Sequence, residues 1–173
     1  MEPLFQEIVS GPDLPLSVIV ARSVGALTFA AIIGFERKVD GRPAGLRTHM
    51  LISLAACVYS LIMLSLLSRA DDMGDVVRMD PIRIVEAVTQ GVAFLAAGLV
   101  VFTKGTVRGL TTGASMWLCA AVGLACGIGE WILAGLTTIL ALTVISLIRF
   151  GEKKAGTYEP GHVEQKEQGE DHG

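Results

Sequence analysis

The sequence predicts an all-α membrane protein, a polytopic bundle of five transmembrane helices followed by a disordered polar tail. Only 18% of its 173 residues are charged, against about 25% in an average soluble domain. The charges are also uneven, because residues 109–129 and 131–148 contain no Asp, Glu, Lys or Arg. Runs of this length match the roughly 20 apolar residues that a helix needs to cross a bilayer core. This pattern excludes a soluble enzyme, and a net charge of −3 offers no basic surface for nucleic acid.

The first two spans follow an acidic N-terminal segment. Residues 1–13 contain Glu2, Glu7 and Asp13 and no Lys or Arg, so they lack the positive start of a secretory signal peptide. The first span is expected at about 14–35, and the second at about 46–68, between Arg47 and Arg69. The segment 1–13 is therefore predicted to lie outside, ahead of a transmembrane domain over 14–149.

The remaining three spans are delimited by helix-capping residues and by short polar segments between them. The third, about 82–102, follows Asp80-Pro81, an N-cap residue with proline in the first helical position. The fourth, about 110–129, and the fifth, about 131–149, are so close that they must form a tight hairpin. Residues 150–173 are polar and Gly-rich and cannot bury enough apolar surface to offset their chain entropy, so they are predicted to be disordered.

The basic residues predict the orientation in the membrane. Ten of the fourteen Lys and Arg residues fall in the 36–47 loop, the 103–109 loop and the region after the fifth span. Cytoplasmic loops carry the excess of Lys and Arg. The sequence therefore predicts an N-terminus outside and a C-terminus in the cytoplasm.

Two ionisable residues, Arg22 and Glu86, lie inside apolar spans, where a charge is costly. At 1.5 Å per residue, Arg22 is about 12 Å and Glu86 about 6 Å below the outer surface. We expect the two side chains to face the bundle interior and to form an ion pair. The alternative is a polar site on an ion path.

The only candidates for metal ligands are acidic. Carboxylates of this kind could meet a hydrated divalent cation; they are Asp71, Asp72, Asp75, Asp80 and Glu86. For the four aspartates, a solvated outer loop with no ligand is the expected explanation. We expect no cofactor, with bound Mg²⁺ as the alternative. No phosphate-binding loop, nucleophile elbow or zinc-protease motif is present, so no enzymatic activity is expected.

Small residues recur at four-residue spacing, as in Gly123/Gly127 and Ala21/Gly25. In lipid, small residues let helix backbones approach closely. They predict packing within the bundle, with a homo-oligomer interface as the alternative.

The loop between the first two spans has a distinctive sequence, with glycines and a proline that fix a turn among several charged residues. Its candidate functional residues are Glu36, Arg37, Arg42, Pro43, Gly45, Arg47, Thr48 and His49. This stretch resembles the signature of the MgtC/SapB family of bacterial inner-membrane proteins, G-x-E-R followed by G-x-P-A-G-L-R-T-H. Glu36 is expected to face Arg37, Arg42 or Arg47.

Two further segments are similar to motifs of the same family. Residues 91–98, GVAFLAAG, look like its G-I-G-F-L-G-A-G, with Ala93 and Ala96 where glycine is usual. Residues 107–117 look like its V-R-G-L-T-T-A-A-S-x-W. The residues assigned to helix packing or to these motifs are Gly91, Phe94, Gly98, Arg108, Thr111, Thr112 and Trp117.

The resemblance implies a function as well as a fold. It implies a role in magnesium homeostasis, in adaptation to low magnesium and in virulence, exerted without enzymatic activity on other membrane proteins such as the rotary ATP synthase. Longer members carry a soluble C-terminal domain, so this chain is similar to the shorter, membrane-only type. The alternative function is a small divalent-cation (magnesium) transporter or channel, expected to be a homodimer. In either case the protein is expected to form a homo-oligomer.

Overall fold

The computed structural model describes residues 14–39, 42, 44–72, 80–103 and 106–154. The predictions for the N-terminal segment 1–13, for Pro43 and Asp75 and for residues 155–173 lie outside these residues. Within them the chain forms five helices and one short ribbon of two strands. The helices are α2 (Leu16–Val39), α3 (Leu46–Asp72), α4 (Ile82–Leu99), α5 (Leu110–Ile128) and α6 (Trp131–Lys154), and the strands are β1 (Val101–Thr103) and β2 (Thr106–Arg108).

The predicted all-α bundle is confirmed. Four helices are long and apolar enough to cross a membrane, namely α2, α3, α4 and α5. In α6 the apolar stretch Trp131–Leu147 has 17 residues, at the lower limit for a span. The helix itself continues to Lys154, beyond the predicted end of the fifth span at about 149.

The β1–β2 ribbon was not predicted. The third span was expected to reach residue 102, but α4 ends at Leu99 and Val100 is already extended, with φ −81° and ψ 112°. The strands pair antiparallel, with Val101 opposite Arg108. Valine and threonine, which favour extended structure, make up most of both strands.

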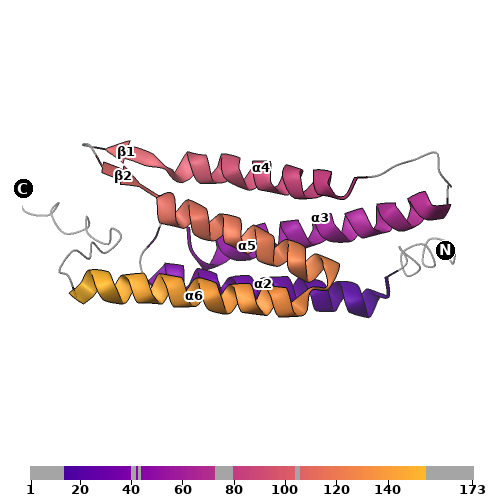
Figure 1. Ribbon diagram of the computed structural model, residues 1–173, viewed down its shortest axis with the longest axis horizontal. Coiled ribbons are helices and arrows are strands. Elements are labelled where there is room, and N and C mark those ends of the chain that lie inside the picture. The colour runs from indigo at the N-terminus through magenta and orange to yellow at the C-terminus, as the bar shows by residue number, and fades with distance from the viewer. Residues whose placement is uncertain (1–13, 40–41, 43, 73–79, 104–105, 155–173) are drawn as a thin grey trace, which may run out of the picture.

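The helices run alternately up and down, so that α2 begins at one end of the bundle and α6 ends at the other (Figure 1). The α2–α3 turn, the β1–β2 ribbon and the end of α6 lie together, and we call this the ribbon end. The α5–α6 turn lies toward the opposite end. It is the predicted tight hairpin, closed by Gly129 in a left-handed conformation with φ 92°.

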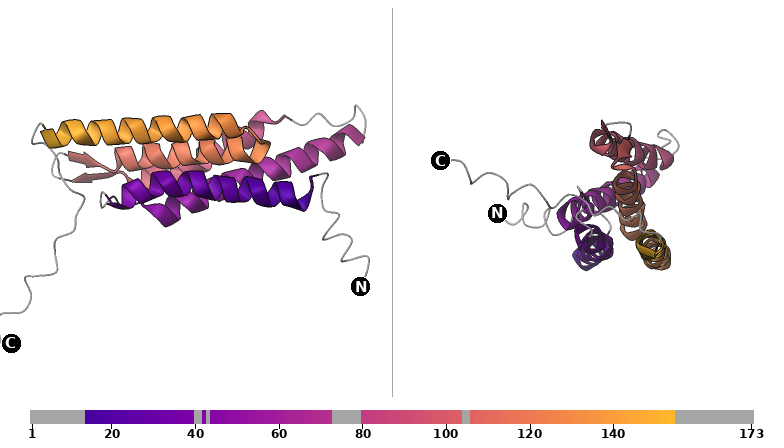
Figure 2. Two further views of the ribbon diagram at one scale, coloured as in Figure 1. Left: turned by 90° about the horizontal axis from the view of Figure 1, so that it is seen from below. Right: turned by 90° about the vertical axis from the view of Figure 1, so that its left-hand side faces the viewer.

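Helix α5 is the centre of the bundle. It packs against α2, α3, α4 and α6, and the end-on view in Figure 2 shows it between α4 on one side and α2 and α6 on the other. In the apolar stretch of α5, 61% of the residues are buried, against 11% in the apolar stretch of α4. The fourth span is therefore the core helix, and α4 lies at the edge.

The predicted packing through small residues occurs between α3 and α5. A Cβ atom added to Gly127 would lie 2.7 Å from the Cys57 carbonyl oxygen, and one added to Gly123 would overlap the carbonyl oxygen of Ser53. Ser60 Oγ lies at the same interface, 3.2 Å from the Ala56 carbonyl oxygen of its own helix and 3.3 Å from the Leu124 carbonyl oxygen of α5, and its one hydrogen is shared between them. The two backbones are thus in direct contact along this face.

Candidate functional site

The α2–α3 turn at the ribbon end holds the first motif. Arg37 is buried, and its Nε donates to Glu36 Oε2 at 2.7 Å. Glu36 was expected to face Arg37, Arg42 or Arg47, and it pairs with Arg37. The Arg42 backbone N–H donates to the Arg37 carbonyl at 3.2 Å, which closes the turn. Charge and backbone together hold the end of α2 in place.

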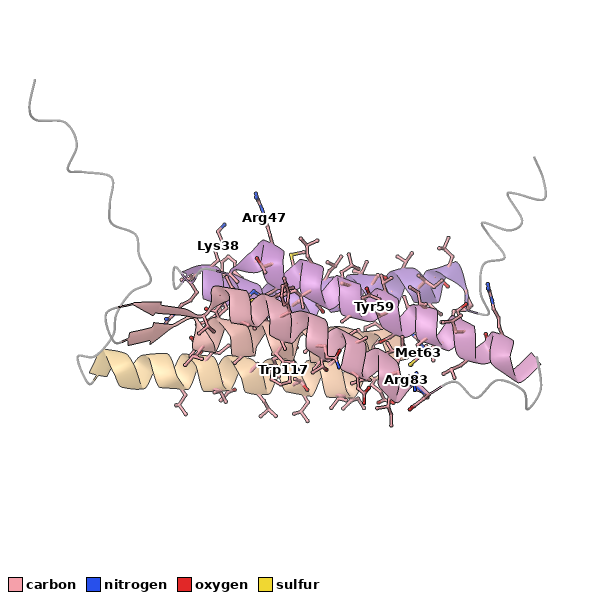
Figure 3. All side chains as sticks on the ribbon, turned by 90° about the horizontal axis from the view of Figure 1, so that it is seen from above. Lys38, Arg47, Tyr59, Met63, Arg83 and Trp117 are labelled. Atoms are coloured by element: carbon pink, nitrogen blue, oxygen red, sulfur yellow. The ribbon has the colours of Figure 1, made fainter. Side chains whose placement is uncertain are left out.

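Two other basic residues of this turn face outward. Lys38 and Arg47 are both exposed, and Figure 3 shows their side chains projecting from the same side of the ribbon end. No hydrogen bond or ion pair joins Arg47 to another described residue. The turn therefore contains an ion pair between buried Arg37 and partly buried Glu36, and two exposed cations, Lys38 and Arg47.

His49 is the buried polar centre of the ribbon end. Its side chain is fully buried and connects the first turn of α3 to α5. Nδ1 lies 2.8 Å from the Gly45 carbonyl oxygen, and Nε2 lies 3.0 Å from Ser115 Oγ. Ser115 Oγ in turn lies 2.8 Å from the Thr112 carbonyl oxygen. All polar atoms of the imidazole are therefore satisfied, as burial requires.

The hydrogen atoms in this series of hydrogen bonds, from Gly45 through His49 and Ser115 to Thr112, can be counted. A carbonyl oxygen only accepts, so Nδ1 of His49 carries a hydrogen. Ser115 has one hydroxyl hydrogen, which it donates either to the Thr112 carbonyl or to Nε2. In the first case Nε2 must also carry a hydrogen, and the imidazole is charged. Because His49 is fully buried without a contacting carboxylate among the described residues, the neutral imidazole is favoured, with Ser115 donating to Nε2.

Ser115 was not among the predicted site residues, although it belongs to the third motif. The sequence feature that could have identified Ser115 is its hydroxyl, three residues after Thr112 on a helix without charges. A buried hydroxyl needs a hydrogen-bond partner. Thr112 is buried, as expected for a packing residue, whereas Thr111 and Trp117 are exposed on the outside of α5. Arg108 ends β2, and its side chain lies outside the described part.

The three residues assigned to the second motif, Gly91, Phe94 and Gly98, face outward. A Cβ added to Gly91 or Gly98 would meet nothing within 4 Å, and Phe94 is 80% exposed. The predicted role of these residues in packing is therefore not fulfilled among the described residues of one chain. Instead α4 packs on α5 through other positions, such as Val88 and Val92, which are buried.

The prediction that Arg22 pairs with Glu86 is wrong for this structure. Arg22 Nη1 donates to the Gly127 carbonyl at 2.7 Å, at the C-terminus of α5, and its guanidinium packs against Gly129. Glu86 is exposed on α4. The physical reason is that α5 separates α2 from α4 (Figure 2). The last carbonyls of α5 carry a partial negative charge, which the cation of Arg22 neutralises.

The described residues contain no group of three His, Cys, Asp or Glu side chains that could hold a metal ion. Asp80 instead caps α4, because its Oδ1 accepts a hydrogen bond from the Ile82 N–H at 3.0 Å, as the N-cap prediction implied. Asp71 and Asp72 lie in the last turn of α3, but their side chains are outside the described part.

Comparison with known proteins identifies the family. The profile of the MgtC family matches residues 24–154. The protein MgtC of Brucella abortus (strain 2308) is 34% identical over 156 residues, which cover 86% of this chain and 62% of that protein. The putative magnesium transporter YhiD of Escherichia coli (strain K12) is 35% identical over 135 residues, covering 76% and 62%.

The protein MgtC of Salmonella typhimurium (strain 14028s / SGSC 2262) is 35% identical over 126 residues, covering 73% of this chain and 50% of that protein. This chain thus spans between half and two thirds of the length of these relatives. No solved structure shows significant similarity to it. The match over all five helices, together with the three motifs, shows that the chain belongs to the MgtC family.

Proposed function

We propose that this protein is a non-enzymatic regulatory protein of the bacterial inner membrane, which acts in adaptation to low magnesium by contacting other membrane proteins. Membership of the MgtC family and the name of the Escherichia coli relative support the connection with magnesium. The regulatory mechanism rests on one observation, the open face of α4.

This face is formed by Ala87, Gly91 and Phe94, which share one side of the helix at four- and three-residue spacing and are all exposed. Small residues on a membrane helix allow a second helix to approach closely. Elsewhere, Gly123 and Gly127 are already covered by α3. The face of α4 is therefore the surface that we assign to a partner helix, from a protein such as the rotary ATP synthase or, as the alternative, from a second copy of this chain.

The proposed orientation places the ribbon end in the cytoplasm. The described part of its α2–α3 turn contains Arg37, Lys38, Arg42 and Arg47 with a single acid, Glu36, and basic residues favour the cytoplasmic side. Cysteine labelling in intact cells tests this. A cysteine at Lys38 should be protected from an impermeant reagent and one at Asp72 should react; labelling of both from the same side would contradict the orientation.

The test of the function is complementation of a deletion strain at limiting magnesium. A Cβ on Gly91 would meet nothing within 4 Å, so we expect Gly91→Leu to fill the face of α4 with normal abundance and loss of growth. Ala93→Leu is the matched control, because Ala93 is also exposed but lies on another side of α4. Equal growth of the Gly91→Leu strain and wild type would contradict a role for this face.

The second candidate is a magnesium transporter or channel. Glu86 favours it, because this carboxylate is exposed on a membrane helix rather than paired with Arg22. Liposomes containing the purified protein and a magnesium-sensitive dye separate the two functions. The regulatory proposal predicts the same magnesium entry as in empty liposomes. Entry that depends on the protein and is lost in Glu86→Gln would support the transporter instead.

A further inference from the structure

An open cleft lies between α3 and α4, with Met116 of α5 among its lining residues. It has a volume of about 500 Å³ and lies where α3 begins and α4 ends. Its lining is mostly apolar, with Arg47 and Thr48 as the polar residues at its head, and includes Leu51, Leu95, Gly98, Leu99 and Met116. It forms because α3 and α4 pack mainly on α5 and only slightly on each other.

The glycine at position 98 keeps the cleft open. A Cβ at Gly98 would meet nothing within 4 Å, so a larger side chain there would extend into free space. Met116 from α5 forms the floor and is buried. The cleft is thus a trough with apolar walls that faces the lipid.

Its head carries unneutralised positive charge. Arg47 lies in the first turn of α3, where the chain meets the membrane surface, and it has no ion-pair partner among the described residues. Lys38 projects beside it (Figure 3). The nearby carboxylate of Glu36 is already bound to Arg37.

We infer that the cleft binds one anionic phospholipid, with its phosphate on Arg47 and Lys38 and an acyl chain along Leu51, Leu95 and Leu99. A headgroup phosphate matches the charge at the head of the cleft, and basic pockets between membrane helices are suited to acidic headgroups. An acyl chain matches the apolar trough. This inference does not depend on the proposed function, since Gly91 and Phe94 do not line the cleft.

The dimensions favour a lipid over a protein helix. On α3 the lining residues extend from Arg47 to Ile52, a rise of about 8 Å at 1.5 Å per residue. A partner helix would need a longer contact face, whereas the upper part of one acyl chain needs no more than this. A cation at the interface adds about 1 kcal/mol of attraction to an acidic lipid, or roughly fivefold in affinity.

The experiment is a lipid titration of the purified full chain in neutral detergent, followed by native mass spectrometry and thermal unfolding. Phosphatidylglycerol and phosphatidylcholine with the same acyl chains are compared, with inorganic phosphate as a third probe. We expect one tightly bound phosphatidylglycerol per chain, a higher unfolding temperature with it, weaker binding of phosphatidylcholine, and no stabilisation by phosphate.

Variants separate the headgroup from the trough. Arg47→Gln should weaken phosphatidylglycerol binding about fivefold and leave phosphatidylcholine unchanged. Arg69→Gln is the matched control, an exposed arginine near the other end of α3, and should change neither. Gly98→Leu should weaken both lipids by filling the trough. Leu95→Trp serves the same purpose if Gly98→Leu is poorly folded.

Several outcomes would overturn the inference. They are equal binding of the two lipids, equal effects of Arg47→Gln and Arg69→Gln, unchanged lipid binding in both trough variants, and full stabilisation by inorganic phosphate. A dimer of wild-type protein that Gly98→Leu dissociates would assign the cleft to a second copy of the chain and would likewise overturn it.

Discussion

The contact between α3 and α5 allows one substitution to be compared at two glycines of the same bundle. Replacing a mid-helix glycine by alanine favours the helix by about 1 kcal/mol. At Gly91 on α4 the new methyl group meets nothing within 4 Å, so Gly91→Ala should stabilise the protein by up to this amount. At Gly123 the same methyl group would overlap the backbone carbonyl of Ser53. A backbone cannot rotate away as a flexible side chain can.

The expected cost at Gly123 follows from this overlap. Overpacking a close-packed core costs about 1–3 kcal/mol, and separation of α3 from α5 would also strain the 3.3 Å hydrogen bond from Ser60 to Leu124. After the gain in helix propensity, Gly123→Ala should be destabilising by about 1–2 kcal/mol. The two alanine variants should therefore differ by about 2–3 kcal/mol in opposite directions from wild type.

The assay is reversible unfolding in a mixture of mild detergent and sodium dodecyl sulfate, followed by circular dichroism. The folded spectra of the two variants should match that of wild type, which shows that both retain their helices. If Gly123→Ala is as stable as Gly91→Ala, the close approach of α3 and α5 does not exist in the membrane protein, and the reasoning is refuted.

Three further predictions concern polar or strained positions. Arg22→Gln should lower the free energy of unfolding by about 1–2 kcal/mol, because it removes the cation at the C-terminus of α5. Glu86→Gln should change it by less than about 0.5 kcal/mol, and the effects should add in the double variant. Non-additive effects would show that Arg22 and Glu86 do interact. Ser115→Ala should cost about 1–3 kcal/mol because it removes a partner of the buried His49, and unchanged unfolding would contradict that contact. Gly109→Ala should destabilise by more than about 1 kcal/mol, because Gly109 has φ 92° and faces the Leu99 carbonyl; an unchanged unfolding midpoint would show that the turn accepts a Cβ.

The spans could be predicted because the thickness of a bilayer imposes a minimum length of apolar sequence, which hydropathy shows directly. The β1–β2 ribbon could not, since strands of three residues are too short to establish a repeating pattern. Hydropathy also does not reveal which helices touch. For this reason the sequence paired Arg22 with Glu86 incorrectly: both were expected in the outer half of the membrane, but α5 lies between their helices.

In the candidate site, too, the sequence predicted the unusual residues but not the contacts between helices. The sequence identified His49 and the basic turn, because glycine, proline and clustered charges stand out in an apolar chain. It did not identify Ser115 as the partner of His49, because that contact joins residues 66 positions apart and depends on the approach of α3 to α5. The exposure of Phe94 was equally hidden, since a glycine-rich segment has the same sequence whether it faces another helix or lipid.

The central position of α5 has a consequence for synthesis. Arg22, His49 and Ser60 all bond to residues of α5, at separations of 105, 66 and 64 residues. At about 5–20 residues per second, a ribosome makes Gly127 roughly 5–20 s after Arg22. During that interval the newly inserted α2 and α3 hold polar groups whose final partners do not yet exist. The nascent chain must therefore keep these groups solvated, at the insertion machinery or at the membrane surface, until its fourth membrane helix arrives.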